Sequence, residues 1–291
     1  MPPEIITLVN TVLVPIGLML IMFSMGLTLQ LSDFRLVLAH HRTVIGGLCG
    51  QLLLMPLLAF LIGWLLRLPP QYALGLFILG ICPAGTTSNA LTFVGRGNVA
   101  LAVVLTASSS LITVFTIPLL LRWAIAHFNY GTGRALSLTD TMLQLVRVTV
   151  CPIALGMILR RLIPSFASSA SKWLRPVSLL ILIAVIAFAV GTSAEMVVDH
   201  LWTAGPAIVL LNLAAMGAGL GIARLINAGD ADAMTLAIEV GVHNVTLATF
   251  LTLTVLHNLS LAVTQNIYGV VMIITAMTLI RWFRPRLAAA A

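Results

Sequence analysis

Charged residues are scarce in this sequence of 291 residues. Asp, Glu, Lys and Arg together make up 8% of the chain, whereas a soluble domain carries about 25%. Hydrophobic residues make up 60% of the chain, and its mean hydropathy is +1.12. Too few polar side chains are left to cover a water-exposed surface, so the composition excludes a soluble globular protein and predicts a membrane protein.

Several functional classes lack the residues that they need. The net charge is +7, but no basic cluster is interleaved with aromatic side chains, so no nucleic-acid partner is expected. The three cysteines lie inside apolar runs, which argues against a disulfide framework or a zinc site. The motifs His-Glu-x-x-His and Gly-x-Ser-x-Gly are absent, so the sequence predicts neither an enzyme nor catalytic residues nor a cofactor.

Long apolar runs separated by short polar loops fill most of the chain. A helix needs about 20 apolar residues to cross the hydrocarbon core of a bilayer. The N-terminus has no positive n-region and its apolar run is too long for a signal peptide, so the first span is expected to be retained. No loop is long enough for a soluble domain, so residues 1–291 are predicted to form a single all-α membrane domain. The nine predicted transmembrane helices are at about 5–30, 43–66, 72–95, 98–126, 138–162, 173–195, 201–226, 232–256 and 259–282.

The basic residues predict how these helices are oriented. Nine spans place the two termini on opposite sides, and Lys and Arg gather in the cytoplasmic connections of membrane proteins. With the C-terminus inside, eleven basic residues belong to inner connections and three, Arg67, Arg122 and Arg134, to outer ones, while Arg147 lies within the fifth span. The sequence therefore predicts a multi-pass protein of the cell (inner or plasma) membrane, with its N-terminus outside and its C-terminus inside.

Two of the predicted spans are interrupted near their middle. In the third, Pro83 removes a backbone donor and Gly85 loosens the helix, and in the eighth the run from Glu239 to Asn244 contains a glycine and two polar residues. Paired interruptions at corresponding places indicate an inverted repeat with a transport site at its interface. The repeats cover about 5–126 and about 138–282, with two discontinuous helices that cross and with the fifth span left unpaired.

Glu239 is the one acid in the apolar stretch between Asp232 and Arg281. An acid at membrane depth costs about 2.5–3.5 kcal/mol on insertion scales, so it is retained mainly where a cation, a proton or a partner lies against it. The half-helices that begin near Thr86 and Asn244 direct the positive ends of their dipoles at the breaks. These two residues are therefore predicted to bind a carboxylate or sulfonate substrate.

The motifs resemble those of the bile acid:sodium symporter family, in its bacterial nine-span form. The resemblance rests on Met22–Leu29 followed by Asp33, on the run 82–89, on Arg96–Leu101, and on Glu239–Gly241 with Asn244. It implies a core domain in which two broken helices cross, and a panel domain that moves against it. It also implies secondary active transport, with sodium as the coupling ion.

The resemblance further implies two sodium sites. Oxygen ligands suit such a hard cation. Two positions depart from the family's pattern: Ala102 replaces a serine in the first site and His243 replaces a glutamine in the second. The first site would use Ser88, Asn89, Thr106 and Glu239, and the second would use Gln51, Glu239, His243 and the backbone carbonyls of Val240 and Val242.

Some of these residues have a second interpretation. Ser88 and Asn89 equally fit caps of a half-helix, and Thr106 and Gln51 fit contacts between helices. Asn212, Gln265 and Asn266 are interpreted as packing or cavity residues.

Two alternatives stay open for His243. The ring hydrogen-bonds backbone groups freed by the break, or, when protonated, it pairs with Glu239 in place of a sodium ion. In the second case coupling at that site would be proton-linked or absent.

The sequence thus favours a sodium-coupled symporter of a small organic anion that works by alternating access. A proton-coupled or uncoupled carrier of an organic anion is the alternative. A channel is less favoured because the spans are apolar except at the breaks. Membrane lipid is the expected surrounding, while the identity of the anion, the number of sodium ions and the oligomeric state stay open.

Overall fold

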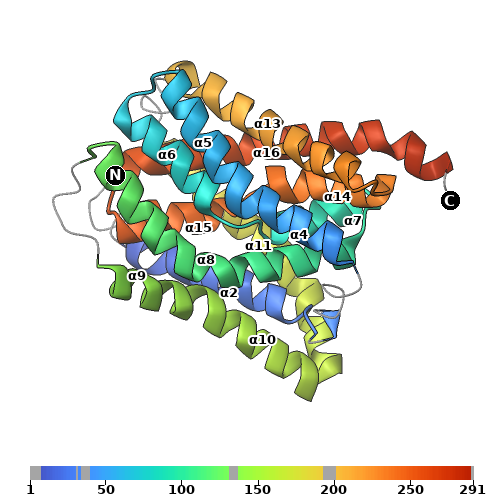
Figure 1. The fold of residues 1–291 in the computed structure, drawn as a ribbon. Helices are drawn as coiled ribbons and strands as arrows, with labels where there is room; N and C mark the ends of the chain where they lie inside the picture. The colour runs from blue at the N-terminus through green and yellow to red at the C-terminus, as the bar shows by residue number, and fades with distance from the viewer. Residues whose placement is uncertain (1–7, 31, 34–39, 131–136, 193–200, 290–291) are drawn as a thin grey trace.

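The structure is a computed structural model that describes residues 8–30, 32–33, 40–130, 137–192 and 201–289 (Figure 1). Within these residues the regular structure is helical, apart from one isolated bridge. The helices are η1 (Val9–Leu13), α2 (Val14–Gly26), α4 (His41–Cys49), η3 (Gly50–Leu54), α5 (Met55–Leu65), α6 (Pro70–Ile81), α7 (Thr86–Val94), α8 (Val99–His127), α9 (Leu138–Leu145), η4 (Val146–Val150), α10 (Cys151–Leu162), α11 (Pro164–Thr192), α13 (Gly205–Leu225), α14 (Asp230–Gly241), α15 (Val245–Phe250), η5 (Leu251–Val255) and α16 (Leu259–Ala289), where η marks a π-helix.

In the part of the chain that the structure describes, five helical stretches are long and apolar enough to cross a membrane, and they agree with five predicted spans to within a few residues. The predicted third and eighth spans are each divided into two shorter helices, as expected from their interruptions. The remaining predicted spans are shorter or lie partly outside the described residues, so the count of nine and the inverted repeat stay predictions. The five stretches are His41–Leu65, Val99–His127, Leu138–Leu162, Gly205–Leu225 and Leu259–Leu287.

One predicted loop is wrong. Residues 164–172 form the beginning of α11. Pro164 is its first residue, a position where the fixed backbone angle of proline favours a helix. The alanines and serines that follow are compatible with a helix despite their low hydropathy.

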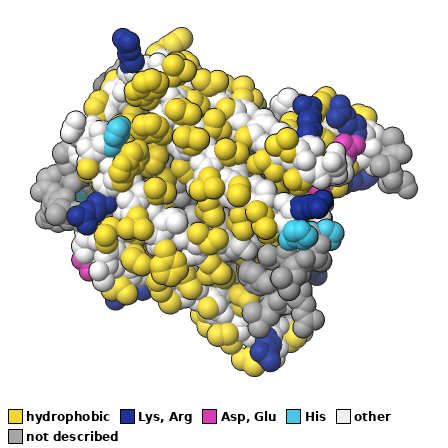
Figure 2. All heavy atoms as spheres, viewed as in Figure 1, with side chains coloured by type: hydrophobic (Ala, Val, Ile, Leu, Met, Phe, Trp, Pro, Cys, Tyr) yellow, Lys and Arg dark blue, Asp and Glu magenta, His cyan; other side chains and the backbone are white. Residues whose placement is uncertain are grey.

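The surface seen in Figure 2 is mostly apolar. Hydrophobic side chains cover the middle of this face, and the Lys and Arg side chains lie toward its edges. Charged groups placed beyond an apolar belt are typical of a protein that crosses a bilayer.

The helices pack in two groups. In the α2 group, α2 lies along α10 and α11, and α9 and η4 continue into α10. The π-helix η1 continues into α2 and belongs to the same group. The crossover group holds the other helices, with α14 packed along α13, α16 and α8. The groups meet where α2 contacts α15, where α11 contacts α16 and where α8 contacts α9.

Glycines allow α2 and α10 to touch backbone to backbone. A Cβ atom on Gly156 would lie 2.6 Å from the Phe23 carbonyl oxygen, and one on Gly26 would overlap the Ile153 carbonyl group. Real Cβ atoms do not come so close to backbone atoms, so this crossing requires glycine in both helices.

Three of the four π-helices end two residues before a proline: Pro15, Pro56 and Pro152. A proline has no N–H for the carbonyl four residues earlier, so an α-helical bond is lost there. The chain instead forms bonds between residues five apart, such as that from the Met55 N–H to the Gly50 carbonyl. The π-helix η3 carries Gln51, one of the predicted site residues, and π segments are frequent at functional sites.

Candidate functional site

The two helix breaks lie against each other at the centre of the crossover group. Ala84, between α6 and α7, forms an isolated antiparallel bridge with His243, between α14 and α15. The Asn244 N–H also donates to the Pro83 carbonyl at 2.8 Å. In Figure 1, α6 and α15 lie toward one end of the molecule and α7 and α14 toward the other. The two broken helices therefore cross, and each break satisfies backbone groups of the other.

Glu239 is the buried carboxylate beside this crossing. Its Oε2 atom accepts hydrogen bonds from Thr106 Oγ1 at 2.9 Å and from Gln51 Nε2 at 3.1 Å. Gln51 Nε2 also reaches the Glu239 carbonyl oxygen, at 3.0 Å. The other carboxylate oxygen, Oε1, and Gln51 Oε1 are buried and have no hydrogen-bond partner in the described part of the chain. Buried acceptors without donors are costly, so a cation or a proton is needed beside them.

The residues predicted for the first sodium site come together around this carboxylate. The Thr106 hydroxyl lies 3.5 Å from the Ser88 hydroxyl and 3.3 Å from Asn89 Oδ1. Because Thr106 has a single hydroxyl proton, it donates either to Asn89 or to Glu239, and the shorter distance favours Glu239. Ala102 is fully buried and contributes no side-chain oxygen. Four side chains from α7, α8 and α14 therefore place oxygen atoms in one cluster.

The residues predicted for the second site are arranged differently. His243 Nδ1 lies 2.6 Å from the Cys82 carbonyl oxygen, and Nε2 lies 3.0 Å from the Val240 carbonyl oxygen. Carbonyl oxygens only accept, so the ring donates to one of them when neutral and to both when both nitrogens carry protons. Both contacts are with backbone carbonyls at the breaks and neither is with the Glu239 carboxylate, so the structure has the first of the two alternatives for His243. Val242 directly follows α14 in extended backbone.

The ring of His243 is packed tightly as well as hydrogen-bonded. Its side chain is buried, and the Tyr268 ring lies edge-on to it with the ring centres 6.5 Å apart. The Nε2 atom of the ring therefore lies in contact with the Val240 carbonyl oxygen, which the resemblance assigns to sodium.

The two residues predicted to bind substrate lie where the second half-helices begin. Thr86 is the first residue of α7 and follows Gly85, which has no side chain to cap the helix. Asn244 caps α15, because its Oδ1 accepts a hydrogen bond from the Leu247 N–H at 2.9 Å. The Asn244 Nδ2 atom is buried without a partner in the described residues.

Polar residues of α16, two of which the sequence interpreted as packing or cavity residues, also lie in the region of the crossing. Both amide atoms of Gln265 and the Asn266 Oδ1 atom are buried without a hydrogen-bond partner among the described residues. The Thr264 Oγ1 atom is also buried without a hydrogen-bond partner in the described residues. The signal for them in the sequence was three consecutive polar residues inside an apolar span, and their unsatisfied atoms mark a polar region beside the crossing.

Asn212 has a structural role at the second break. Its Nδ2 atom donates to the Gly241 carbonyl oxygen at 2.8 Å, and the Tyr268 hydroxyl donates to the same oxygen at 2.9 Å. These two bonds satisfy a carbonyl that the end of α14 leaves free. The assignment of Asn212 to packing therefore fits its place beside the break.

The donor set beside Glu239 fits a hard monovalent cation. Hydroxyl, amide and carboxylate oxygens are the ligands that such ions prefer, and half-helix ends at a crossing supply further carbonyls. No group of three or more His, Cys, Asp or Glu side chains gathers in the described residues, so the arrangement does not fit a soft transition metal there.

Comparisons with known proteins identify relatives of this chain. The model of a family described as the Sodium Bile acid symporter family matches residues 15–200. The chain is 34% identical over 229 residues to the probable sodium/metabolite cotransporter BASS1, chloroplastic, of Arabidopsis thaliana, covering 79% of this chain and 56% of that protein. The chain thus spans little more than half of that relative's length.

Two further relatives are covered over more of their length. The uncharacterized sodium-dependent transporter YocS of Bacillus subtilis is 32% identical over 243 residues, which cover 83% of this chain and 74% of that protein. The ileal sodium/bile acid cotransporter of Cricetulus griseus is 30% identical over 246 residues, which cover 82% of this chain and 68% of that protein.

Proposed function

This chain belongs to the sodium bile acid symporter family, and we propose that it is a sodium-coupled symporter of a small organic anion. The matched relatives are named as transporters or cotransporters, so the family is one of membrane transporters and not of enzymes. Beyond membership of the family, we propose which residues bind the coupling ion, how many sodium ions bind, which class of substrate is transported and which movement transports it.

The Glu239 carboxylate is the observation that carries the proposal. It is fully buried, its side-chain partners Gln51 and Thr106 are neutral, and one of its oxygens has no partner in the described residues. A buried charge without a counter-charge costs several kcal/mol, so an ion must arrive to neutralise it. A sodium ion beside Glu239 would neutralise the charge and also take oxygens from Ser88, Asn89 and Thr106.

We propose that one sodium ion binds at this first group and that His243 takes the place of the second. Nε2 lies 3.0 Å from the Val240 carbonyl oxygen and Nδ1 lies 2.6 Å from the Cys82 carbonyl oxygen in the opposite break, so the ring fills the space beside both carbonyls, and with both nitrogens protonated it would donate to both. A ligand set that loses a carbonyl to the ring and offers nitrogen in place of an amide oxygen is a poor sodium site. The chain would therefore move one sodium ion with each anion.

The substrate would lie beside the crossing, where α16 passes the breaks. The unsatisfied amide of Gln265, the Nδ2 atom of Asn244 and the Oδ1 atom of Asn266 supply donors and acceptors for a polar molecule. The N-terminus of α7 at Thr86 adds a positive dipole end, which favours an anionic group. A small carboxylate or sulfonate combines these features.

Movement of the α2 group against the crossover group would expose this region to each side in turn. The two groups touch through α2 with α15 and α11 with α16, that is, beside the second broken helix. In the predicted orientation the N-terminus lies outside and the C-terminus inside the cell membrane. A sodium gradient across that membrane would then drive uptake of the anion.

Uptake into proteoliposomes tests the proposal. Purified protein is reconstituted, a sodium gradient is imposed at equal pH on both sides, and a panel of labelled organic anions is screened. The proposal expects saturable, concentrative uptake of at least one anion that collapses when potassium replaces sodium. Uptake driven equally by a proton gradient without sodium would instead establish the proton-coupled carrier, in which Glu239 carries the proton.

A further inference from the structure

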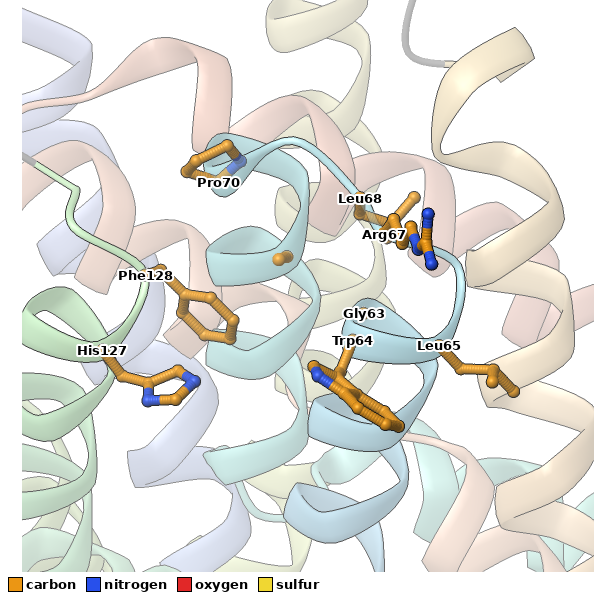
Figure 3. Close-up of a pocket in the computed structure, with 9 residues that line it drawn as sticks. Gly63, Trp64, Leu65, Arg67, Leu68, Pro70, His127 and Phe128 are labelled. Carbon is orange, nitrogen blue, oxygen red and sulfur yellow. The ribbon is translucent and has the colours of Figure 1, made fainter.

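A cavity at one end of the molecule is not used by the proposed transport cycle. It has a volume of about 540 Å3 and lies between the end of α5, the start of α6 and the end of α8. This is within the range of about 300–1,000 Å3 found for small-molecule pockets. Figure 3 shows His127, the last residue of α8, and Phe128 after it on one side of the cavity, and Trp64 of α5 and Arg67 after its end on the other.

The cavity is basic and aromatic. Arg67 and His127 line it, as do Trp64 and Phe128, and no acidic side chain does. The His127 ring is held in place by stacking on Trp123, with the ring centres 4.9 Å apart and the planes 16° from parallel. Among the described residues that line the cavity, none offers a carboxylate to pair with the Arg67 guanidinium group.

Arg67 occupies a backbone position where glycine is favoured. Its φ angle is +50°, and the chain ends α5 with hydrogen bonds from the Arg67 N–H to the Trp64 carbonyl and from the Leu68 N–H to the Gly63 carbonyl. A left-handed residue at this point of a helix end is usually glycine, because other residues are strained there. Arginine at this place fixes a cation at the rim of the cavity.

The cavity adjoins an exposed apolar face of α5, which Trp64 shares with it. Leu57, Leu61 and Trp64 follow one another at four and three residues along α5, so they share one side of the helix, and they are 49%, 42% and 67% exposed. Tryptophan at the end of an apolar helix is typical of the level of lipid headgroups. An acyl chain that lies along this face would bring a phosphate group to Arg67.

We propose that this cavity binds the phosphate headgroup of an anionic phospholipid. The phosphodiester accepts hydrogen bonds from the Arg67 guanidinium and from His127, and its glycerol backbone packs on Trp64. The acyl chains follow Leu61 and Leu57 toward the middle of the bilayer. The bound lipid contacts α5, α6 and α8 and links them to one another. These helix ends lie on the side of the membrane that the distribution of Lys and Arg predicts to be outside the cell.

Native mass spectrometry of the delipidated protein tests this site. The protein is titrated with phosphatidylglycerol or phosphatidylcholine of equal chain length, and the retained lipid is counted. Arg67→Gly removes the cation and relieves the backbone strain, so the variant keeps its fold. We expect the affinity for phosphatidylglycerol to fall about tenfold, because the variant loses one charge-assisted hydrogen bond to the phosphate.

Arg96→Gly is the matched control. Arg96 has the same backbone conformation at the end of α7, with φ +61°, and it does not line the cavity. The Arg96→Gly variant should bind phosphatidylglycerol with the same affinity as the wild type. Equal phosphatidylglycerol affinity in Arg67→Gly and the wild type would overturn the proposal.

Two further measurements distinguish a bound phospholipid from a soluble phosphate and from the transported anion. Glycerol phosphate, which has no acyl chains, should not displace phosphatidylglycerol at equal concentration, and displacement would show a soluble phosphate site instead. Arg67→Gly should leave the anion concentration for half-maximal transport unchanged in liposomes of either lipid. A shift in that concentration without a loss of lipid binding would assign the cavity to the transported anion.

Discussion

Replacing Thr106 by valine removes one hydroxyl from the centre of the proposed sodium site while keeping the shape of the side chain. That hydroxyl lies 2.9 Å from Glu239 Oε2 and links the carboxylate to Ser88 and Asn89. In the proposed site the hydroxyl oxygen would also be a ligand of the sodium ion, and we take the energy of this contact to be that of a hydrogen bond to a charged group, about 1.5–3 kcal/mol. Since each 1.4 kcal/mol corresponds to a factor of about ten, sodium affinity should fall about 10- to 100-fold.

The assay is the sodium concentration for half-maximal anion uptake in proteoliposomes. Thr106→Ser is the matched control, because it keeps the hydroxyl and removes only a methyl group, and it should retain sodium dependence close to that of the wild type. Size-exclusion chromatography checks that both variants are folded. An unchanged half-maximal concentration in Thr106→Val would refute the placement of sodium beside this hydroxyl.

The other predictions concern the same site and the packing of the α2 group. Glu239→Gln should abolish sodium-driven uptake while leaving a folded protein, and concentrative uptake at the wild-type rate would contradict this. Asn89→Ala should also weaken sodium affinity, because it removes the Oδ1 atom that lies 3.3 Å from the Thr106 hydroxyl, and an unchanged half-maximal sodium concentration would remove Asn89 from the site. His243→Gln frees the Val240 carbonyl and restores an amide oxygen, so the Hill coefficient for sodium should rise above one; an unchanged coefficient would leave His243 a purely structural residue. Gly156→Ala should lower the free energy of unfolding by about 1–3 kcal/mol through overpacking against α2, measured by thermal unfolding in detergent, whereas Gly217→Ala, whose added Cβ would meet no atom within 4 Å, should not.

The interruptions of the two broken helices were predictable from the sequence because their signals are local. A proline and a glycine close together in one apolar run, and an acid with a glycine and two polar residues in the other, disfavour an unbroken apolar helix. The structure has its breaks at those residues, between Ile81 and Thr86 and between Gly241 and Val245. The meeting of Glu239 with Ser88, Asn89 and Thr106 followed from the resemblance and not from local signals.

The sequence left two alternatives open for His243, hydrogen bonds to backbone freed by the break or a pair with Glu239, and it could not identify the backbone partners. One partner, the Cys82 carbonyl, lies 161 residues away in the chain, and only the fold brings it to the ring. The π-helix at Gln51 was missed for a similar reason. Its signal, a proline five residues later, indicates a disturbed helix without specifying which bonds replace the lost one.

Polar residues on α13 and α16 show a different limit of prediction from the sequence. A polar side chain in an apolar span is satisfied by a neighbouring helix or left free for a ligand, and the sequence does not distinguish the two. Asn212 is satisfied by the Gly241 carbonyl, whereas both amide atoms of Gln265 have no partner in the described residues. Only the positions of neighbouring helices separate a packing residue from one available to a substrate.

Direct binding of radioactive sodium to the purified protein tests the central claim without knowledge of the substrate. Binding is measured at constant pH and ionic strength, with potassium replacing sodium as the concentration is varied. The account predicts saturable binding of one sodium ion per chain, lost in Glu239→Gln and weakened in Thr106→Val. Equal binding by the wild type and Glu239→Gln, or no saturable binding by the wild type, would contradict it.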